Sequence, residues 1–97
     1  MVRDRTQHIS SGLQKLLHQS GMDRKLKEQR ILDEWLLVVG ENIGKISHPE
    51  RVRDKTLYIR VQSMTWRTEL LFQQKAILQR IADHVGKDIV TDIRFFF

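Results

Sequence analysis

The stretch Leu57-Tyr58-Ile59-Arg60-Val61-Gln62-Ser63 decides the fold of this chain. Its aliphatic side chains alternate with polar or aromatic ones, which is the two-residue period of a strand with one buried face. Such a strand needs a second layer to cover its apolar side. The sequence therefore predicts a sheet with helices on one face and with Tyr58 and Arg60 on the other face.

The flanking segments supply two more strands. Residues 46–52 form a weaker strand pattern, and the turn Arg53-Asp54-Lys55-Thr56 closes a hairpin onto the strand predicted at 57–63, called the decisive strand below. Because Pro49 cannot donate to a strand ladder, we expect this strand at an edge of the sheet or bulged at Pro49. The segment 88–97 is strand-like through Ile89, Ile93 and Phe95.

Two amphipathic helices are predicted ahead of the strands. The first covers about residues 7–20 and ends at Gly21; its apolar stripe is Ile9, Leu13, Leu16 and Leu17. The second runs from an Asp23 cap to a stop at Gly40; its main apolar face is Ile31, Leu32, Trp35, Val38 and Val39. Leu26 and Leu37 fall on the opposite side, so we expect this helix to lie between the first helix and the sheet.

A long third helix is predicted from an N-cap at Ser63 to Gly86. Its core stripe is Trp66, Leu70, Ile77, Leu78, Ile81 and Val85. Phe72 lies well off this stripe, so it is covered either by the N-terminal helix or by another chain. The whole pattern predicts one α+β domain over residues 1–97, in the order ααββαβ, with a three-stranded sheet and helices on one face.

The composition of the chain limits the classes of partner and site that it can have. The 97 residues carry 17 Lys plus Arg against 12 Asp plus Glu, a formal charge of +5, which favours an anionic partner. There is no Cys, hence no disulfide or thiolate zinc site. The sequence shows no secretory signal and no run of about 20 apolar residues, so we expect a cytoplasmic protein with no membrane contact.

Catalytic and metal-binding patterns are missing. The four histidines, His8, His18, His48 and His84, do not share a helical metal spacing with a carboxylate. The neighbours Asp83 and His84 point about 100° apart on a helix, and no phosphate-binding glycine loop occurs. We therefore expect no cofactor, no metal and no enzymatic activity.

Two groups of residues are candidates for nucleic-acid binding. Most of the net charge lies before Ile31, in a basic N-terminal helical segment with Arg3, Arg5, Lys15, Arg24, Lys25, Lys27 and Arg30. The second group is Tyr58 and Arg60, which offer one ring for stacking and one cation for phosphate. The alternatives are a solvated helix face and an ordinary exposed sheet face.

A candidate protein interface lies on the third helix. At 100° per residue, Phe72, Lys75 and Gln79 lie within about 60° of one another, on the side away from the core stripe. An aromatic ring flanked by a cation and an amide is typical of a small interface centre.

Several short motifs occur in a familiar order. They are Trp35-Leu36-Leu37-Val38-Val39-Gly40, His48-Pro49, the decisive strand with its closing Ser63, Trp66-Arg67-Thr68-Glu69-Leu70, Gly86, and Ile93-Arg94-Phe95. From about Leu26 to Phe95 the chain resembles the DciA-like family of bacterial replicative-helicase loaders. The resemblance implies a KH-like fold, no enzymatic activity, binding to the hexameric DnaB-type helicase, and affinity for single-stranded DNA.

The chain departs from longer members of that family and from true KH domains. It stops at Phe97, without the basic tail of those members, and it has no GxxG loop to clamp a nucleic-acid backbone. The motif residues Trp35, Trp66 and Leu70 all fall on predicted core faces. We therefore expect a helicase loader with weak, sequence-independent single-strand binding; the alternatives are a KH-like RNA-binding or ribosome-associated module, and a homodimerisation module.

Overall fold

Strand β2 (Thr56–Val61) is the middle strand of a three-stranded sheet, between β1 (Ser47–Arg53) and β3 (Asp92–Phe96). In the computed structural model, which describes residues 21–97, β1 pairs antiparallel and β3 parallel with β2. Leu57 and Ile59 have no exposed surface, so the alternation along β2 buries one face as predicted. The predicted α+β class and three-stranded sheet are confirmed.

The β1–β2 hairpin carries the predicted irregularity at its edge strand. Asp54 and Lys55 both have positive φ, as the tight turn requires. The pairing register shifts between Pro49 and Arg51, so Glu50 is the extra residue of a bulge. Beyond the bulge, Arg51 lies opposite Tyr58, and the side chain alternation of β1 again matches that of β2.

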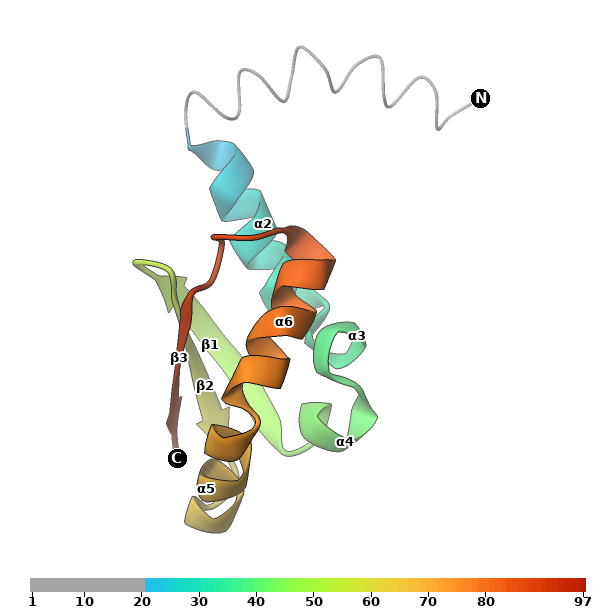
Figure 1. The fold of residues 1–97 in the computed structure, drawn as a ribbon, viewed down its shortest axis with the longest axis vertical. Helices are drawn as coiled ribbons and strands as arrows, with labels where there is room; N and C mark the ends of the chain where they lie inside the picture. Colours follow the sequence, from blue (N-terminus) through green and yellow to red (C-terminus); the bar gives the residue numbers. More distant parts are fainter. Residues whose placement is uncertain (1–20) are drawn as a thin grey trace.

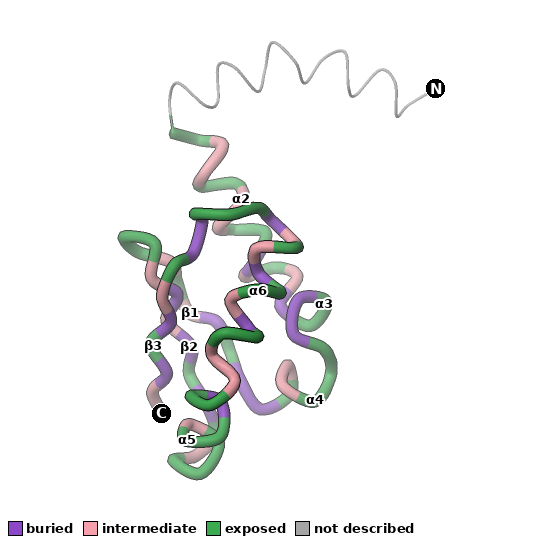
Figure 2. Tube along the Cα trace, in the orientation of Figure 1, coloured by how far each residue is buried: buried purple, intermediate pink, exposed green. Residues whose placement is uncertain are grey.

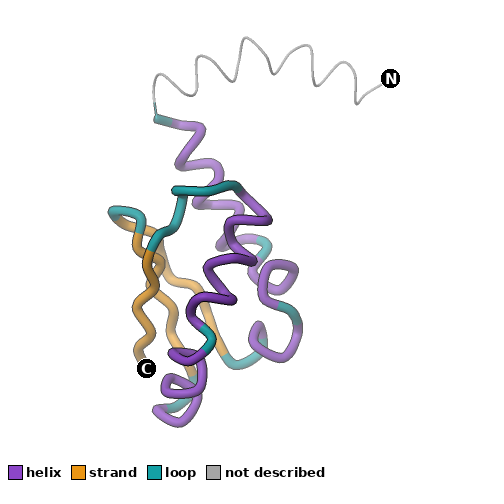
Figure 3. The backbone as a smooth tube through the Cα atoms, viewed as in Figure 1, coloured by secondary structure: helices purple, strands orange, loops and turns teal. Residues whose placement is uncertain are grey.

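Five helical segments are seen within residues 21–97, and they lie to one side of the sheet, with α5 near its lower end (Figure 1). Their bounds are α2 Met22–Asp33, α3 Trp35–Val39, α4 Glu41–Gly44, α5 Met64–Phe72 and α6 Gln74–Val85. None of them is long and apolar enough to cross a membrane. Figure 3 shows short loops between α2, α3 and α4 and between α5 and α6, whereas the strands β1 and β2 separate α4 from α5.

Both predicted long helices are interrupted. The helix expected from Asp23 to Gly40 breaks at Glu34, and the helix expected from Ser63 to Gly86 breaks at Gln73. The predicted ends at Gly40, Ser63 and Gly86 are correct, and the Ser63 hydroxyl accepts a hydrogen bond from the Trp66 amide at 3.2 Å. The predicted Asp23 cap is wrong: α2 begins at Met22 after Gly21, and Asp23 lies in its first turn. Each break lets the next helix change direction, which a single straight cylinder cannot do.

One core fills the space between the sheet and the helices (Figure 2). The fully buried side chains of Ile31, Leu70, Ile77 and Ile81 meet Leu57 and Ile59 of the sheet there. Much of the predicted core is confirmed, with one clear error.

Trp66 was predicted as a core residue and is 40 % exposed. The predicted second apolar side of α2 and α3 is also exposed in the described part of the chain: Leu26 is 55 % and Leu37 76 % exposed. The helix predicted for residues 7–20, which was expected to cover that side, lies outside the described residues.

A buried polar relay joins α3 to the first strand. The indole Nε1 of Trp35 donates to Ser47 Oγ at 2.9 Å, and that hydroxyl donates to the Ile43 carbonyl at 2.6 Å. Trp35 is 5 % exposed, so its indole N–H is shielded from water and depends on Ser47 as its acceptor. The relay therefore fixes the position of α3 and α4 relative to β1.

Replacing Ser47 with Ala should lower the free energy of unfolding by about 1–3 kcal/mol, because it leaves the Trp35 N–H buried without an acceptor. Urea unfolding followed by circular dichroism measures this loss. Thr68→Ala on the exposed side of α5 is the matched control and should stay within about 0.5 kcal/mol of wild type. Equal losses in the two variants would contradict the role of the relay.

The break between α2 and α3 is tied to the end of α6. Glu34 Oε1 accepts from His84 Nε2 at 2.6 Å and from Arg30 Nε at 2.9 Å. These hydrogen bonds, that of His84 above all, lower the pKa of Glu34 below its ordinary value. A lowered folded-state pKa contributes stability above the ordinary pKa, and this stability is lost as the pH falls through the lowered one.

Glu34→Gln should therefore reduce stability at neutral pH, and the difference from wild type should shrink as the pH falls through the acidic range. Denaturant unfolding at a series of pH values checks this. Glu28→Gln, at a residue with no ion pair within residues 21–97, should show no such convergence. A Glu34 difference that is constant with pH would rule out the ionic contribution.

Candidate partner-binding surfaces

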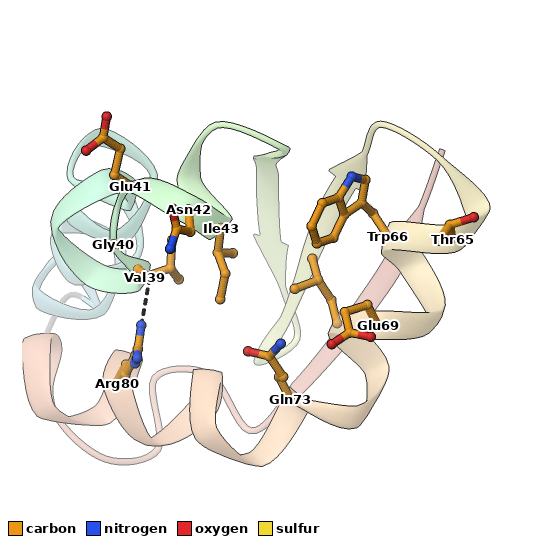
Figure 4. A pocket seen from close by; sticks show the side chains of 11 residues that line it. Val39, Gly40, Glu41, Asn42, Ile43, Thr65, Trp66, Glu69, Gln73 and Arg80 are labelled. Atoms are coloured by element: carbon orange, nitrogen blue, oxygen red, sulfur yellow. Dashed lines mark hydrogen bonds between the residues drawn. The ribbon is translucent and has the colours of Figure 1, made fainter.

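A groove of about 640 Å³ separates the α3–α4 segment from α5. Its walls include Val39 and Ile43 on one side and Trp66 and Leu70 on the other, and the Trp66 ring points into the space between them (Figure 4). The incorrect core prediction for Trp66 has its explanation here. The Trp66 ring lines this groove opposite Val39 and Ile43 and is not packed into the core.

The charged groups of this groove are one arginine and two carboxylates. Arg80 donates from Nη1 to the Val39 carbonyl at 2.6 Å, which holds α6 against the end of α3. Glu41 and Glu69 also line the groove, one on each wall. On a chain of net positive charge, this is an apolar groove with carboxylates at its sides.

The outward side of α5 is apolar as well. Met64, Leu71 and Phe72 are 52 %, 40 % and 86 % exposed, and their spacing places them on one side of the helix, away from Leu70. Phe72 is therefore uncovered by any residue from 21 to 97. The predicted helix 7–20, which was the expected cover for Phe72, lies outside the described residues.

The break at Gln73 changes the basis of the predicted interface. Phe72 ends α5, whereas Lys75 and Gln79 lie on α6, so a single helical wheel does not relate the three residues. Both α6 residues are exposed, and Gln79 Nε2 donates to Asp83 Oδ1 at 2.9 Å. The neighbours of Phe72 on a common face are instead Met64 and Leu71, which the sequence analysis missed because it treated α5 and α6 as one helix.

Three of the four basic residues of α2 lie on one side of the helix, and each is bound to another group of the fold. Arg24 donates to the Asp88 carbonyl at 3.1 Å, Lys27 pairs with Asp23 at 3.4 Å, and Arg30 pairs with Glu34. At 100° per residue, Lys25 and Lys27 point about 160° apart. Of the other predicted contacts, Arg3, Arg5 and Lys15 lie outside the described residues.

The structure places Tyr58 and Arg60 next to each other on the outer face of the sheet. The guanidinium of Arg51 lies 4.5 Å from the centre of the Tyr58 ring, and that of Arg60 lies 4.8 Å from the centre of the Phe96 ring. The sequence analysis missed Arg51 and Phe96. The hairpin register would have indicated Arg51, but the bulge at Glu50 displaces it by one residue from simple alternation.

Metal chemistry has no support in the described part of the chain. Residues 21–97 contain no group of three or more His, Asp or Glu side chains placed to hold an ion. The closest association of such groups, His84 with Glu34, is a structural contact between helices.

Comparison with known proteins finds a family and several relatives. The family described as "Dna[CI] antecedent, DciA" matches residues 8–95. A UPF0232 protein of Corynebacterium glutamicum is 33 % identical over 88 residues, covering 91 % of this chain and 49 % of the relative. A UPF0232 protein of Rhodococcus jostii is 37 % identical over 76 residues, covering 78 % and 40 %. The chain spans about half the length of the curated relatives that it matches.

The contrast between Trp66 and Leu70 yields a test of the groove. Leu70 is 1 % exposed, so Leu70→Ala should cost about 2–5 kcal/mol of unfolding free energy. Trp66→Ala should cost less than Leu70→Ala although it removes more atoms, because the indole already meets solvent in the groove. Chemical denaturation of both variants decides this, and a larger loss at Trp66 would make it a core residue after all.

Proposed function

Because the chain belongs to the DciA family of bacterial replication proteins, which is associated with the DnaB helicase, we propose that it is a non-enzymatic accessory of the replicative helicase. It binds a DnaB-type helicase and assists the loading of that helicase on single-stranded DNA in the cytoplasm. The family match supports the replication role.

The observation that carries the protein contact is the exposure of Phe72. A phenyl ring with 86 % of its surface exposed, on the same side of α5 as Met64 and Leu71, has no role in the core of residues 21–97. Aromatic rings that a partner covers are common interface anchors, and one can contribute about 2 kcal/mol or more when water is excluded. The outer side of α5 is therefore the proposed helicase contact, with Lys75 and Gln79 at its margin on α6.

Phe72→Ala should weaken binding to the DnaB-type helicase of the source bacterium about tenfold or more, while unfolding free energy stays within about 0.5 kcal/mol of wild type. Biolayer interferometry with the purified helicase measures the first quantity, and urea unfolding the second.

Leu26→Ala is the matched control, because Leu26 is, like Phe72, a large exposed apolar residue but lies on α2. It should leave helicase binding unchanged. A Phe72 variant that loses stability together with binding would place the ring in the fold instead. A wild-type chain that fails to bind the helicase would overturn the proposed function.

A further inference from the structure

The outer face of the sheet has an ordered set of side chains that the core does not need. Strand pairing places Arg51, Tyr58 and Arg94 in one row across β1, β2 and β3. The next row is His48, Arg60 and Phe96. Each row thus holds one aromatic ring with cationic or ionisable neighbours, and the ring changes strand from one row to the next. The helices cover the opposite face, so these rows face solvent.

The arginines and the rings are arranged in stacks. Arg51 and Arg60 lie over the Tyr58 and Phe96 rings at 4.5 and 4.8 Å, within the range of a cation–π contact. Within residues 21–97, Arg51 has no carboxylate within 4.0 Å. Its guanidinium is therefore stacked on a ring, and within residues 21–97 no side-chain hydrogen bond occupies its donors.

The charge of this face matches a polyanion. The residues that line its shallow hollow of about 550 Å³ are Glu50, Arg51, Tyr58, Arg60, Arg94 and Phe96. Three are positive and one is negative, and the carboxylate of Glu50 is 3.3 Å from Arg60. The side chains of Arg60 and Arg94 are 54 % and 71 % exposed, so a phosphate can reach them without displacing core residues.

We propose that this outer sheet face, with Arg51, Tyr58, Arg60, Arg94 and Phe96, binds single-stranded DNA. The inference deepens the proposed function by assigning its DNA contact to one surface. Bases stack on the two rings or on the guanidinium planes over them, and the arginines contact the phosphates between those bases. Since no donor here is built to recognise a particular base edge, binding is independent of sequence.

The face is a stronger candidate than the basic residues of α2. Arg24, Lys27 and Arg30 lie on one side of α2, and each is bound to another group of the fold. On the sheet face Arg60 and Arg94 also lie near carboxylates, but Arg51 has no such partner within residues 21–97. α2 also offers no aromatic ring to a base. Stacking needs a ring near a cation, and the sheet supplies two such pairs side by side.

Fluorescence anisotropy with a labelled dT oligonucleotide, measured with the full chain over a range of salt concentrations, tests the phosphate contacts. Each phosphate contact on a single strand contributes a slope of about 0.7 in the logarithmic salt dependence. The triple variant Arg51→Ala, Arg60→Ala, Arg94→Ala should flatten the slope by about 2. The matched control Lys25→Ala, Lys27→Ala, Lys87→Ala removes the same charge elsewhere. It should keep the wild-type slope in the salt dependence of dT binding. An equal loss of slope in both variants would mean general charge attraction and would overturn the proposal.

The aromatic contribution is tested separately. Tyr58→Leu should weaken dT binding about fivefold or more without changing the salt slope, and Tyr58→Phe should restore the affinity because stacking needs only the ring. Glu50→Gln should strengthen binding severalfold, since it removes the one negative charge in the hollow. Thermal melting of every variant confirms that the fold is kept. Unchanged affinity in Tyr58→Leu, or tenfold tighter binding of an rU oligonucleotide of the same length, would overturn the assignment to DNA.

Helicase binding measured on the same variants separates this proposal from the proposed function. The sheet variants should bind the helicase like wild type, because their side chains belong to the strands and not to the outward side of α5. If helicase binding is normal and no sheet variant alters dT binding, the face proposal fails while the proposed function stands. If the wild-type chain binds dT through the face but never binds the helicase, the proposed function fails and the face remains.

Discussion

The burial of one side of strand β2 is the constraint on which the rest of the structure depends. Leu57 and Ile59 have no exposed surface, so helices must cover that side of the sheet along its whole length. The two-residue period then forces Tyr58 and Arg60 to the other side. The apolar core and the charged outer face are thus two consequences of the same short strand, and a shift by one residue would exchange them.

The covering layer is built from short helices whose breaks have structural partners. Glu34 interrupts the first long helical pattern and binds His84 of α6, while Gln73 separates α5 from α6. These breaks let α3, α4 and α5 diverge, and the groove beside Trp66 is the space that results. The exposed rings of Trp66 and Phe72 therefore lie on the same short helix but face different surroundings.

The sequence predicted the strands, the caps at Ser63 and Gly86, and the core residues with strong periodicity, because each depends on local chemistry. It did not predict the breaks at Glu34 and Gln73, since the helical period continues through both. That omission explains the loss of the common wheel for Phe72, Lys75 and Gln79. The exposure of Trp66 depends instead on the groove between α5 and the α3–α4 segment, which the pattern of a single helix does not reveal. The pairs Arg51–Tyr58 and Arg60–Phe96 depend on sheet register and on a bulge, and neither can be obtained from one strand alone.

The parallel attachment of β3 has a consequence for motion. Ile93 of β3 pairs with Leu57 of β2, and helices α5 and α6 lie between these two strands in the sequence. The strand is therefore joined to the sheet only by contacts between residues far apart in the chain. An element near a chain terminus can open by sub-global unfolding while the rest of the protein stays folded. Opening of β3 would take Arg94 and Phe96 away from their rows and would uncover one side of Leu57 at the same moment. The outer face and the core would therefore be disrupted together, in one cooperative step.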